Sequence, residues 1–193
     1  MTLYRILLDI RINKYLKEME KIKEKAASLL QKCEVVVLSS MNAEGYPRPV
    51  PIVRIASEGL STIWMSTGAS SLKTTEFRAN AKAGLCYYSD GDSVVLTGEV
   101  EVIDDAESKE KYWQNWFIKF FPQGVKDPEY ILLKFRSNQA TIYIEDPVSA
   151  RNNRVIVNNP ASGAFISHIF VPDDWTIIVP QHEKVLCSPY FVI

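Results

Sequence analysis

The chain has 193 residues, of which 47% are hydrophobic and 23% are charged, and its formal net charge is −1 at pH 7. That length fits one domain with a sizeable core, or one domain plus extensions. A net charge so close to zero argues against a nucleic-acid-binding protein that relies on a broad basic surface.

The cysteines and the N-terminal residues indicate a reducing environment. Cys33, Cys86 and Cys187 are far apart and only two histidines accompany them. No metal-ligand spacing is present, and we interpret Cys33 and Cys86 as small core residues. Residues 1–10 are too short and polar for a signal peptide, and no apolar run is long enough to span a bilayer. We therefore expect a cytoplasmic location.

The first predicted elements are a helix and three strands. Apolar residues at helical spacing indicate a helix over residues 16–32, and the β-branched run of residues 33–41 indicates a buried strand. Turn-forming residues separate two further strands, over residues 46–56 and 60–65. The helical stripe consists of Met19, Ile22, Ala26, Leu29 and Leu30.

The second of these strands carries prolines at alternate positions, Pro47, Pro49 and Pro51. Alternate residues of an antiparallel strand direct their backbone groups to the same edge, so the prolines remove donors from one edge only. We therefore expect a strand with one unpaired or irregular edge. The side chains that share one face of this strand are Arg48, Val50, Ile52 and Arg54.

The most informative stretch covers residues 63–80, where an apolar strand passes through a hydroxyl-rich loop into a helix predicted over residues 71–80. Lys73 is the second or third residue of that helix, where backbone N–H groups lack intrahelical partners and the helix dipole adds partial positive charge. Hydroxyls and a lysine beside such donors make a seat for a phosphate. Taken alone, these residues also fit an ordinary capped loop with an exposed lysine, and Arg48 also fits a surface arginine.

Two more strands follow, over residues 82–89 and 93–103, and residues 90–92 form a hairpin turn between them. Gly98, inside the second strand, indicates a bulge or a bend.

A helix rich in aromatic residues is predicted next. Asp104 or Asp105 caps its start, and it continues to about residue 119. Its aromatic residues are Tyr112, Trp113, Trp116, Phe117 and Phe120. The last strands, over residues 130–136 and 140–145, flank a Ser-Asn turn.

Many short antiparallel strands, with helices inserted rather than alternating, indicate a small closed β-barrel of the α+β class. Residues after 147 are different, because the run R-N-N-R at 151–154 is typical of a loop. Residues 176–179 and 190–193 fit short strands, and this part of the chain carries no recognisable motif.

Several sequence pieces occur in a specific order: V-V-V-L-S-S, G-Y-P-R-P-V-P, I-W-M-S-T followed by S-L-K, R-A-N-A-K-A-G-L-C-Y-Y, V-L-T-G-E-V-E-V-I-D-D, and W-x-x-W-F-x-x-F-F-P-Q-G with D-P-E-Y-I-L-L-K-F. In this order the chain resembles the pyridoxamine 5′-phosphate oxidase-like, FMN-binding split-barrel family, especially its general-stress-protein-26-type members. The resemblance implies a six-stranded antiparallel split β-barrel with flanking helices over residues 19–146. Residues 1–18 are then an N-terminal extension, and residues 147–193 a C-terminal tail of unknown role.

The resemblance also implies a set of cofactor-binding residues. Arg48 would offer a cation to the polar edge of the flavin, and Ser71 and Lys73 correspond to residues that grip the phosphate. Trp113 and Trp116 would help to wall the pocket from the partner subunit, although aromatic residues of this segment also fit core or dimer-interface positions. The full set is Arg48, Pro49, Val50, Pro51, Ser66, Thr67, Ser71, Leu72, Lys73, Ser93, Trp113 and Trp116.

Two residues depart from the pattern of the family's oxidases. Leu72 stands where they carry an arginine on the phosphate, and Val53 stands where they carry a lysine. No C-terminal segment resembles their substrate-binding end, so we do not expect pyridoxamine phosphate oxidation itself.

The function that the resemblance implies is that of an FMN-dependent oxidoreductase of unassigned substrate. It would work as a homodimer with FMN at the subunit interface and accept electrons from a reduced nicotinamide or a substrate. No catalytic side chain and no metal are assigned. The alternatives are a non-catalytic flavin-binding, stress-related module, a relative that binds deazaflavin F420 or haem, and a purely structural interaction protein.

Overall fold

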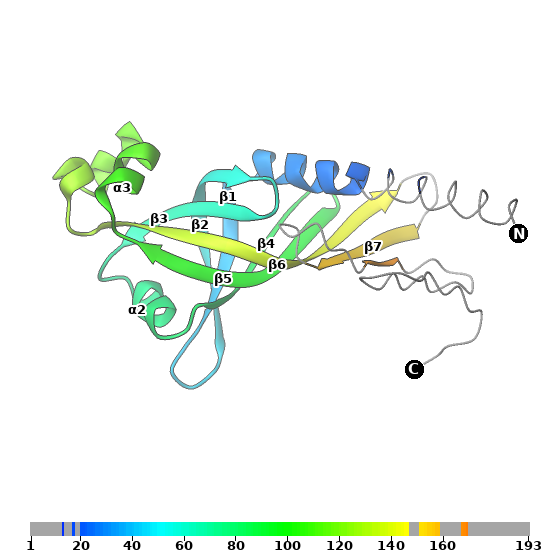
Figure 1. Ribbon diagram of the computed structural model, residues 1–193, viewed down its shortest axis with the longest axis horizontal. Coiled ribbons are helices and arrows are strands. Elements are labelled where there is room, and N and C mark those ends of the chain that lie inside the picture. Colours follow the sequence, from blue (N-terminus) through cyan, green and yellow to red (C-terminus); the bar gives the residue numbers. More distant parts are fainter. Residues whose placement is uncertain (1–12, 14–16, 18–19, 147–150, 159–166, 170–193) are drawn as a thin grey trace, which may run out of the picture.

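The computed structural model describes residues 13, 17, 20–146, 151–158 and 167–169, and its centre is a barrel of six antiparallel strands (Figure 1). These are β1 (Val35–Met41), β2 (Pro47–Glu58), β3 (Thr62–Gly68), β4 (Lys82–Ser89), β5 (Asp92–Ile103) and β6 (Tyr130–Asp146). Their order is β3-β2-β1-β4-β5-β6, and the pairing of β3 with β6 closes the barrel. The predicted α+β split barrel with flanking helices is confirmed.

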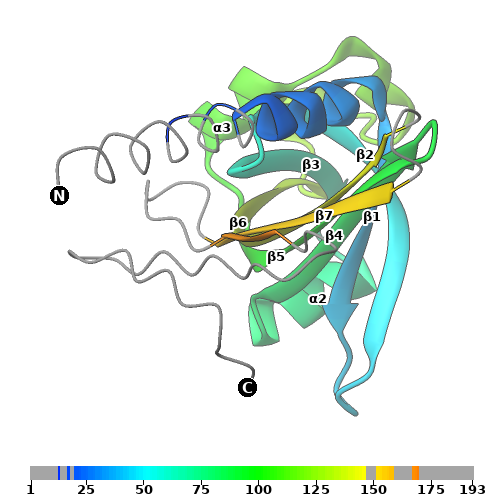
Figure 2. The same ribbon diagram turned by 90° about the vertical axis from the view of Figure 1, so that its right-hand side faces the viewer.

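Apolar side chains from every barrel strand fill the interior. The fully buried residues at its centre include Leu38, Ile63, Met65, Leu85, Leu96 and Phe135. The helix over residues 20–32 lies across the barrel (Figures 1 and 2) and buries Ala26, Leu29 and Leu30 against the same core. This part of the predicted helical stripe is confirmed.

A second core lies on the outer face of β3 and β6, below the segment that joins β5 to β6. That segment contains α3 (Ala106–Tyr112) and the short 3-10 helices η1 (Asn115–Lys119) and η2 (Gly124–Lys126). We call this second core the aromatic cluster; its buried residues are Trp64, Phe117, Phe121, Tyr130 and Leu132.

The predicted aromatic helix is correct at its start but wrong at its end. Asp105 caps α3 by accepting a hydrogen bond from the Ser108 amide at 2.8 Å. The helix stops at Tyr112 because Trp113, with ψ 137°, has extended backbone geometry. With the helix broken here, the Trp113 ring packs edge-on against the Tyr130 ring of β6 at 5.1 Å. Tertiary packing of the rings has overridden local helix propensity.

The three prolines of β2 lie on its unpaired edge, as predicted. β1 pairs with β2 from Pro47 to Val53, whereas β3 pairs with β2 only from Arg54 onward. The Arg54 amide donates to the carbonyl oxygen of Glu34, the residue before β1, at 2.9 Å. Residues at alternate positions from Arg54 therefore face β1, and the prolines, which lack an N–H, face the other edge. Among the described residues, no strand pairs with that edge of β2 before Arg54, where the pairing with β3 begins.

Gly98 marks a bulge, as predicted, and the opposite strand is longer than predicted. The register of β5 against β6 shifts between Thr97 and Gly98. A Cβ atom at Gly98 would lie 2.0 Å from the Arg136 carbonyl oxygen, so only glycine fits there. The two strands predicted on either side of a Ser-Asn turn are one strand, β6, because the bulge absorbs the irregularity without ending the ladder.

The sheet continues beyond the barrel through β7 (Arg151–Asn158) and β8 (Ser167–Ile169). The loop predicted for R-N-N-R is therefore wrong: these residues lie in β7 and pair with the second half of β6. Backbone hydrogen bonds can pair an edge strand whatever the polarity of its side chains, so composition gave no signal. The strands predicted at 176–179 and 190–193 lie outside the described residues.

Candidate functional site

The loop between β3 and α2 (Leu72–Ala79) carries the predicted phosphate seat. Ser71 is the N-cap of α2, but its side chain makes no capping hydrogen bond. Its hydroxyl instead accepts a hydrogen bond from Lys73 Nζ at 2.7 Å. Among the described residues, the amides of Leu72 and Lys73 have no backbone acceptor. The first turn of α2 therefore presents two free N–H donors beside a lysine, as the sequence predicted.

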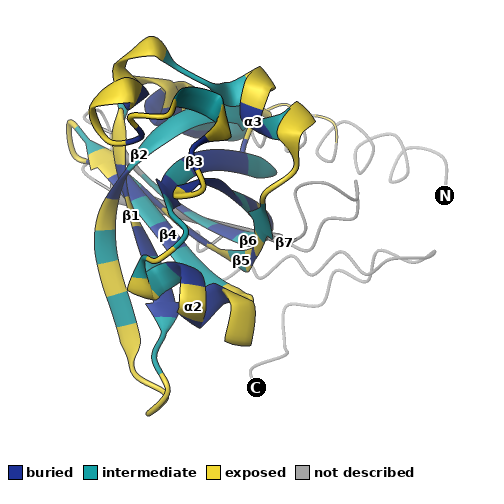
Figure 3. Cartoon of the chain, turned by 90° about the vertical axis from the view of Figure 1, so that its left-hand side faces the viewer, coloured by how far each residue is buried: buried dark blue, intermediate teal, exposed yellow. Residues whose placement is uncertain are grey.

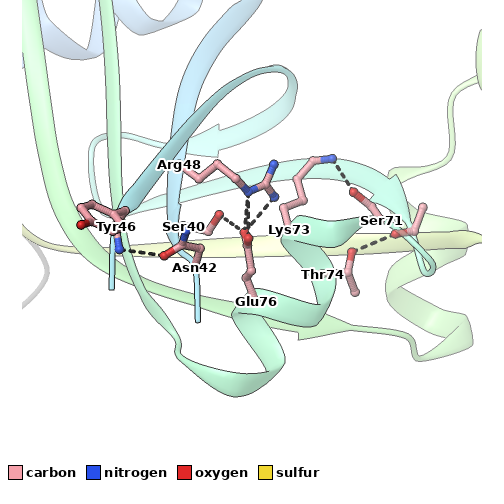
Figure 4. A network of polar contacts seen from close by, with 9 residues as sticks. Ser40, Asn42, Tyr46, Arg48, Ser71, Lys73, Thr74 and Glu76 are labelled. Carbon is pink, nitrogen blue, oxygen red and sulfur yellow. Dashed lines mark hydrogen bonds and ion pairs between the residues drawn. The ribbon is translucent and has the colours of Figure 1, made fainter. Parts of the chain in front are cut away.

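Arg48 reaches this helix from β2 through an ion pair that the sequence analysis missed. Its Nε and Nη2 atoms each lie 2.8 Å from a carboxylate oxygen of Glu76, on α2 (Figure 4). Ser40, on β1, donates a hydrogen bond to the same carboxylate. Glu76 is almost fully buried, with a side chain 8% exposed. The network joins β1, β2 and α2 and fixes the direction of the Arg48 guanidinium.

The electrostatic balance of this network leaves a positive charge without a partner. Burial and the nearby Arg48 cation lower the pKa of Lys73, and Glu76 only partly offsets them. The Arg48 hydrogen bonds hold the pKa of Glu76 below its ordinary value, so Glu76 is ionised at neutral pH. Two cations thus face one carboxylate, and an anion placed here would gain charge-assisted hydrogen bonds.

The other predicted residues of β2 and β3 alternate between two faces. Val50 shares a face with Arg48, whereas Pro49 and Pro51 are exposed on the opposite face. Thr67 is buried, and Ser66, its neighbour on β3, points to the other side of the strand. A ligand lying on one face can therefore contact only part of the predicted set through side chains.

Leu72 and Ser93 differ in where the structure places them. Leu72 is the first residue of α2 and is 62% exposed beside Lys73. Ser93 lies at the start of β5, opposite Tyr88 and Tyr143. Later in β5, the Val100 amide donates to the Ala81 carbonyl, just after α2. Val100 lies seven positions along β5 from Ser93, or roughly 23 Å, so Ser93 is far from the segment that follows α2.

Trp113 and Trp116 lie with the aromatic cluster. Trp113 packs edge-on against Tyr130 at 5.1 Å, and Trp116, 39% exposed, packs against Phe117 at 4.5 Å. Figures 1 and 3 show α3 and α2 on opposite sides of the barrel. Within one chain both tryptophans pack against other aromatic rings, on the side of the barrel opposite α2 (Figures 1 and 3). The role predicted for them in walling the pocket from a partner subunit stays a prediction.

A match over most of the barrel identifies the family. The family model described as pyridoxamine 5′-phosphate oxidase matches residues 22–143. The chain belongs to this family. No curated protein sequence matches the chain.

Solved structures of the pyridoxamine 5′-phosphate oxidase family share the fold of this chain. A protein from Clostridium acetobutylicum, related to general stress protein 26 of B. subtilis, is 25% identical with a TM-score of 0.62, over 72% of this chain and 95% of its own. The general stress protein 26 of Bacillus anthracis str. Sterne is 22% identical, with a TM-score of 0.55, over 62% and 92%. A pyridoxamine 5′-phosphate oxidase-related, FMN-binding protein from Nostoc punctiforme PCC 73102 is 15% identical, with a TM-score of 0.63, over 77% and 94%.

Among the described residues, no helix is both long and apolar enough to cross a membrane, and no group of histidine, cysteine and acidic residues is arranged to hold a metal ion.

Proposed function

We propose that this protein binds FMN and seats the FMN phosphate at the start of α2. The observation that carries the proposal is the charge balance of the site, where Arg48 and Lys73 face the single carboxylate of Glu76. A phosphate monoester carries close to two negative charges at pH 7 and accepts several hydrogen bonds. The likeness in fold to an FMN-binding protein supports the same ligand.

The donor set fits one phosphate group. It consists of the Lys73 ammonium, the Ser71 hydroxyl that this ammonium already contacts, and the free amides of Leu72 and Lys73. The Leu72 side chain adds no charge, although the family's oxidases carry an arginine at this position. We therefore expect a phosphate held by one ammonium and helix donors rather than by two cations.

We further propose that the bound flavin serves an oxidoreductase whose substrate the site does not assign. When bound, FMN supplies the hydride and electron chemistry. The residues of this chain hold and orient it: Lys73 and the α2 amides fix the phosphate end. Arg48 is held in place by Glu76, and its positive charge lies close enough to Lys73 to lower the pKa of that lysine (Figure 4).

We also propose a homodimer formed through the outer face of β1, β4 and β5. Val37, Cys86 and Val95 lie opposite one another across these three strands. Val37 is 36% and Val95 is 42% exposed, and Tyr88 beside them is 80% exposed. Such an apolar exposed row is typical of a subunit interface. Ser93 lies on the same face, so this dimerisation would place it at the interface. Sedimentation velocity should give twice the monomer mass, and a monomer at micromolar concentration would contradict this assembly.

The FMN proposal is tested by the visible spectrum and by a pair of flavins. Purified protein should show or acquire the absorbance of bound FMN. Lys73→Ala should then weaken FMN by about 10- to 100-fold, since a charged hydrogen bond contributes about 1.5–3 kcal/mol. Riboflavin, which lacks the phosphate, should bind the variant as it binds the natural protein. Lys119→Ala, which removes an exposed lysine at the end of η1, is the matched control.

The outcomes separate the candidate functions. A protein that ignores FMN in both spectrum and thermal shift contradicts flavin binding, and a Soret band would indicate haem instead. Preference for F420 over FMN would move the proposal to that cofactor. If FMN binds, oxidation of NADH or NADPH distinguishes an oxidoreductase from a flavin-binding module without turnover. Equal weakening of FMN and riboflavin by Lys73→Ala would mean that Lys73 is not at the phosphate.

A further inference from the structure

The loop that precedes α2 is held by a residue far along the chain, Glu129, just before β6. The Ser70 amide and the Ser70 hydroxyl both donate to Glu129 Oε2, at 3.0 Å and 2.8 Å. The backbone oxygen of Glu129 accepts from the Ala69 amide at 2.8 Å. One residue therefore satisfies two of the three loop amides between β3 and α2.

The loop is shaped to admit this carboxylate. A Cβ atom at Gly68 would lie 3.1 Å from Glu129 Oε2, tighter than nine in ten such contacts, so the carboxylate would have to shift. The Gly68 carbonyl accepts from the Ser71 amide at 3.1 Å and from Thr74 Oγ1 at 2.8 Å. With Ala69, Ser70 and Ser71 satisfied in this way, the first amides left for a ligand are those of Leu72 and Lys73.

Glu129 is itself anchored to a rigid part of the molecule. Its amide donates to Asp127 Oδ1 at 3.0 Å, and the next residue, Tyr130, is fully buried in the aromatic cluster. The Tyr130 hydroxyl also donates to the Lys109 carbonyl at 3.3 Å. The carboxylate that holds the loop thus starts from one of the best-packed points of the structure.

We propose that Glu129 is a positioning residue for the anion site: by fixing Ala69 and Ser70, it directs the Leu72 and Lys73 amides and the Ser71 hydroxyl toward one phosphate. This inference rests on the proposed function for the identity of the ligand, and concerns the same site. The hydrogen bonds from Ser70 also lower the pKa of Glu129, so the carboxylate is ionised and able to accept at neutral pH.

The test compares two variants of Glu129 with two flavins. Glu129→Ala removes the acceptor and should weaken FMN about fivefold, a modest loss because the contact is exposed, while riboflavin binding changes by less than about twofold. Glu129→Gln retains an oxygen that can accept from Ser70 and should bind FMN within about twofold of the natural protein. Glu101→Ala is the control, since it removes an exposed carboxylate that pairs with Arg136 away from the loop.

A second readout does not depend on flavin. Titration with inorganic phosphate, followed by ¹⁵N–¹H spectra, should shift the Leu72 and Lys73 amides in the natural protein and in Glu129→Gln. In Glu129→Ala these shifts should require about fivefold more phosphate. This measurement also reports whether the variants are folded.

The outcomes are distinct for the two proposals. If the natural protein binds phosphate at these amides but no flavin, the FMN proposal fails and the positioning role stands. Equal loss of FMN and riboflavin in Glu129→Ala, or failure of Glu129→Gln to restore FMN binding, overturns the positioning role. Unchanged FMN and phosphate binding in Glu129→Ala overturns it as well, and so does a natural protein whose Leu72 and Lys73 amides ignore phosphate.

Discussion

Two regions at the same end of the barrel differ in chemistry: one is a polar site with unpaired donors, and the other is a buried cluster of aromatic rings. On one side, α2 carries the polar site of Arg48, Lys73 and Glu76, where a cation and two backbone amides are left without counterparts. On the other side, α3 and η1 cover the aromatic cluster, in which Phe117 and Tyr130 are fully buried.

The difference concerns what each region leaves unsatisfied. The aromatic cluster is filled by its own rings, with neighbouring centroids 4.3 to 6.3 Å apart, and it supplies stability, although Trp64 Nε1 is buried there without a hydrogen-bond partner among the described residues. The site on α2 retains an uncompensated charge and free donors, which cost stability unless a ligand completes them. Substitutions should therefore affect unfolding on one side and ligand binding on the other.

The largest effect is expected at the centre of the aromatic cluster. Phe117→Ala should lower the free energy of unfolding by about 3–5 kcal/mol, because a fully buried ring leaves a cavity. Urea denaturation measures the change. Phe120→Ala, in the same segment but with the ring 65% exposed, is the control and should change stability by about 0.5 kcal/mol or less. If folded Phe117→Ala lost FMN affinity without losing stability, the aromatic cluster would serve ligand binding rather than stability, which contradicts this prediction.

An intermediate effect is expected at Glu76. This residue lies in the polar site on α2, but it is nearly buried and its ion pair with Arg48 also contributes to stability. Glu76→Gln should cost about 1–3 kcal/mol of stability at pH 7, because Arg48 loses a charged acceptor that is nearly buried. The pKa of Glu76 is lowered by folding, so its contribution is complete above its ordinary value of 4.5 and is lost as pH falls through the lowered value.

Denaturation of the natural protein and of Glu76→Gln between pH 7 and pH 3 measures this dependence. The difference in stability should be constant down to about pH 5 and shrink below it. Glu101→Gln, which removes an ion pair exposed on both partners, is the control and should cost about 0.5 kcal/mol or less at all pH values. A difference that does not shrink in acid would show that the ionised carboxylate is not the stabilising form.

The smallest effect is expected at Leu72, where the site lacks a charge. Leu72→Arg should tighten FMN about two- to fivefold, since the side chain is exposed and a new cation there is screened by water. Riboflavin affinity and the free energy of unfolding should not change measurably. Leu72→Gln separates charge from polarity, and equal tightening of both flavins by Leu72→Arg would place the phosphate elsewhere.

Much of the fold could be predicted from the sequence because the deciding signals are local. Strand β4 begins and ends where the pattern predicted, and α2 lies within one residue of its predicted bounds. The alternating prolines of β2 and the glycine of the β5 bulge also report local backbone requirements. Predictions failed where packing overrode local preference, at the break after Tyr112 and in the uninterrupted β6.

By itself the sequence determined the succession of strands and helices along the chain and the donors at the start of α2, because hydrogen-bonding and periodicity rules act over a few residues. Only the tertiary structure decided which distant groups complete the site. Glu76 meets Arg48 across 28 positions and Ser40 across 36, and Glu129 meets Ser70 across 59. A carboxylate in a helix or a loop looks the same in sequence whether or not such a partner exists, since only closure of the barrel brings the two together.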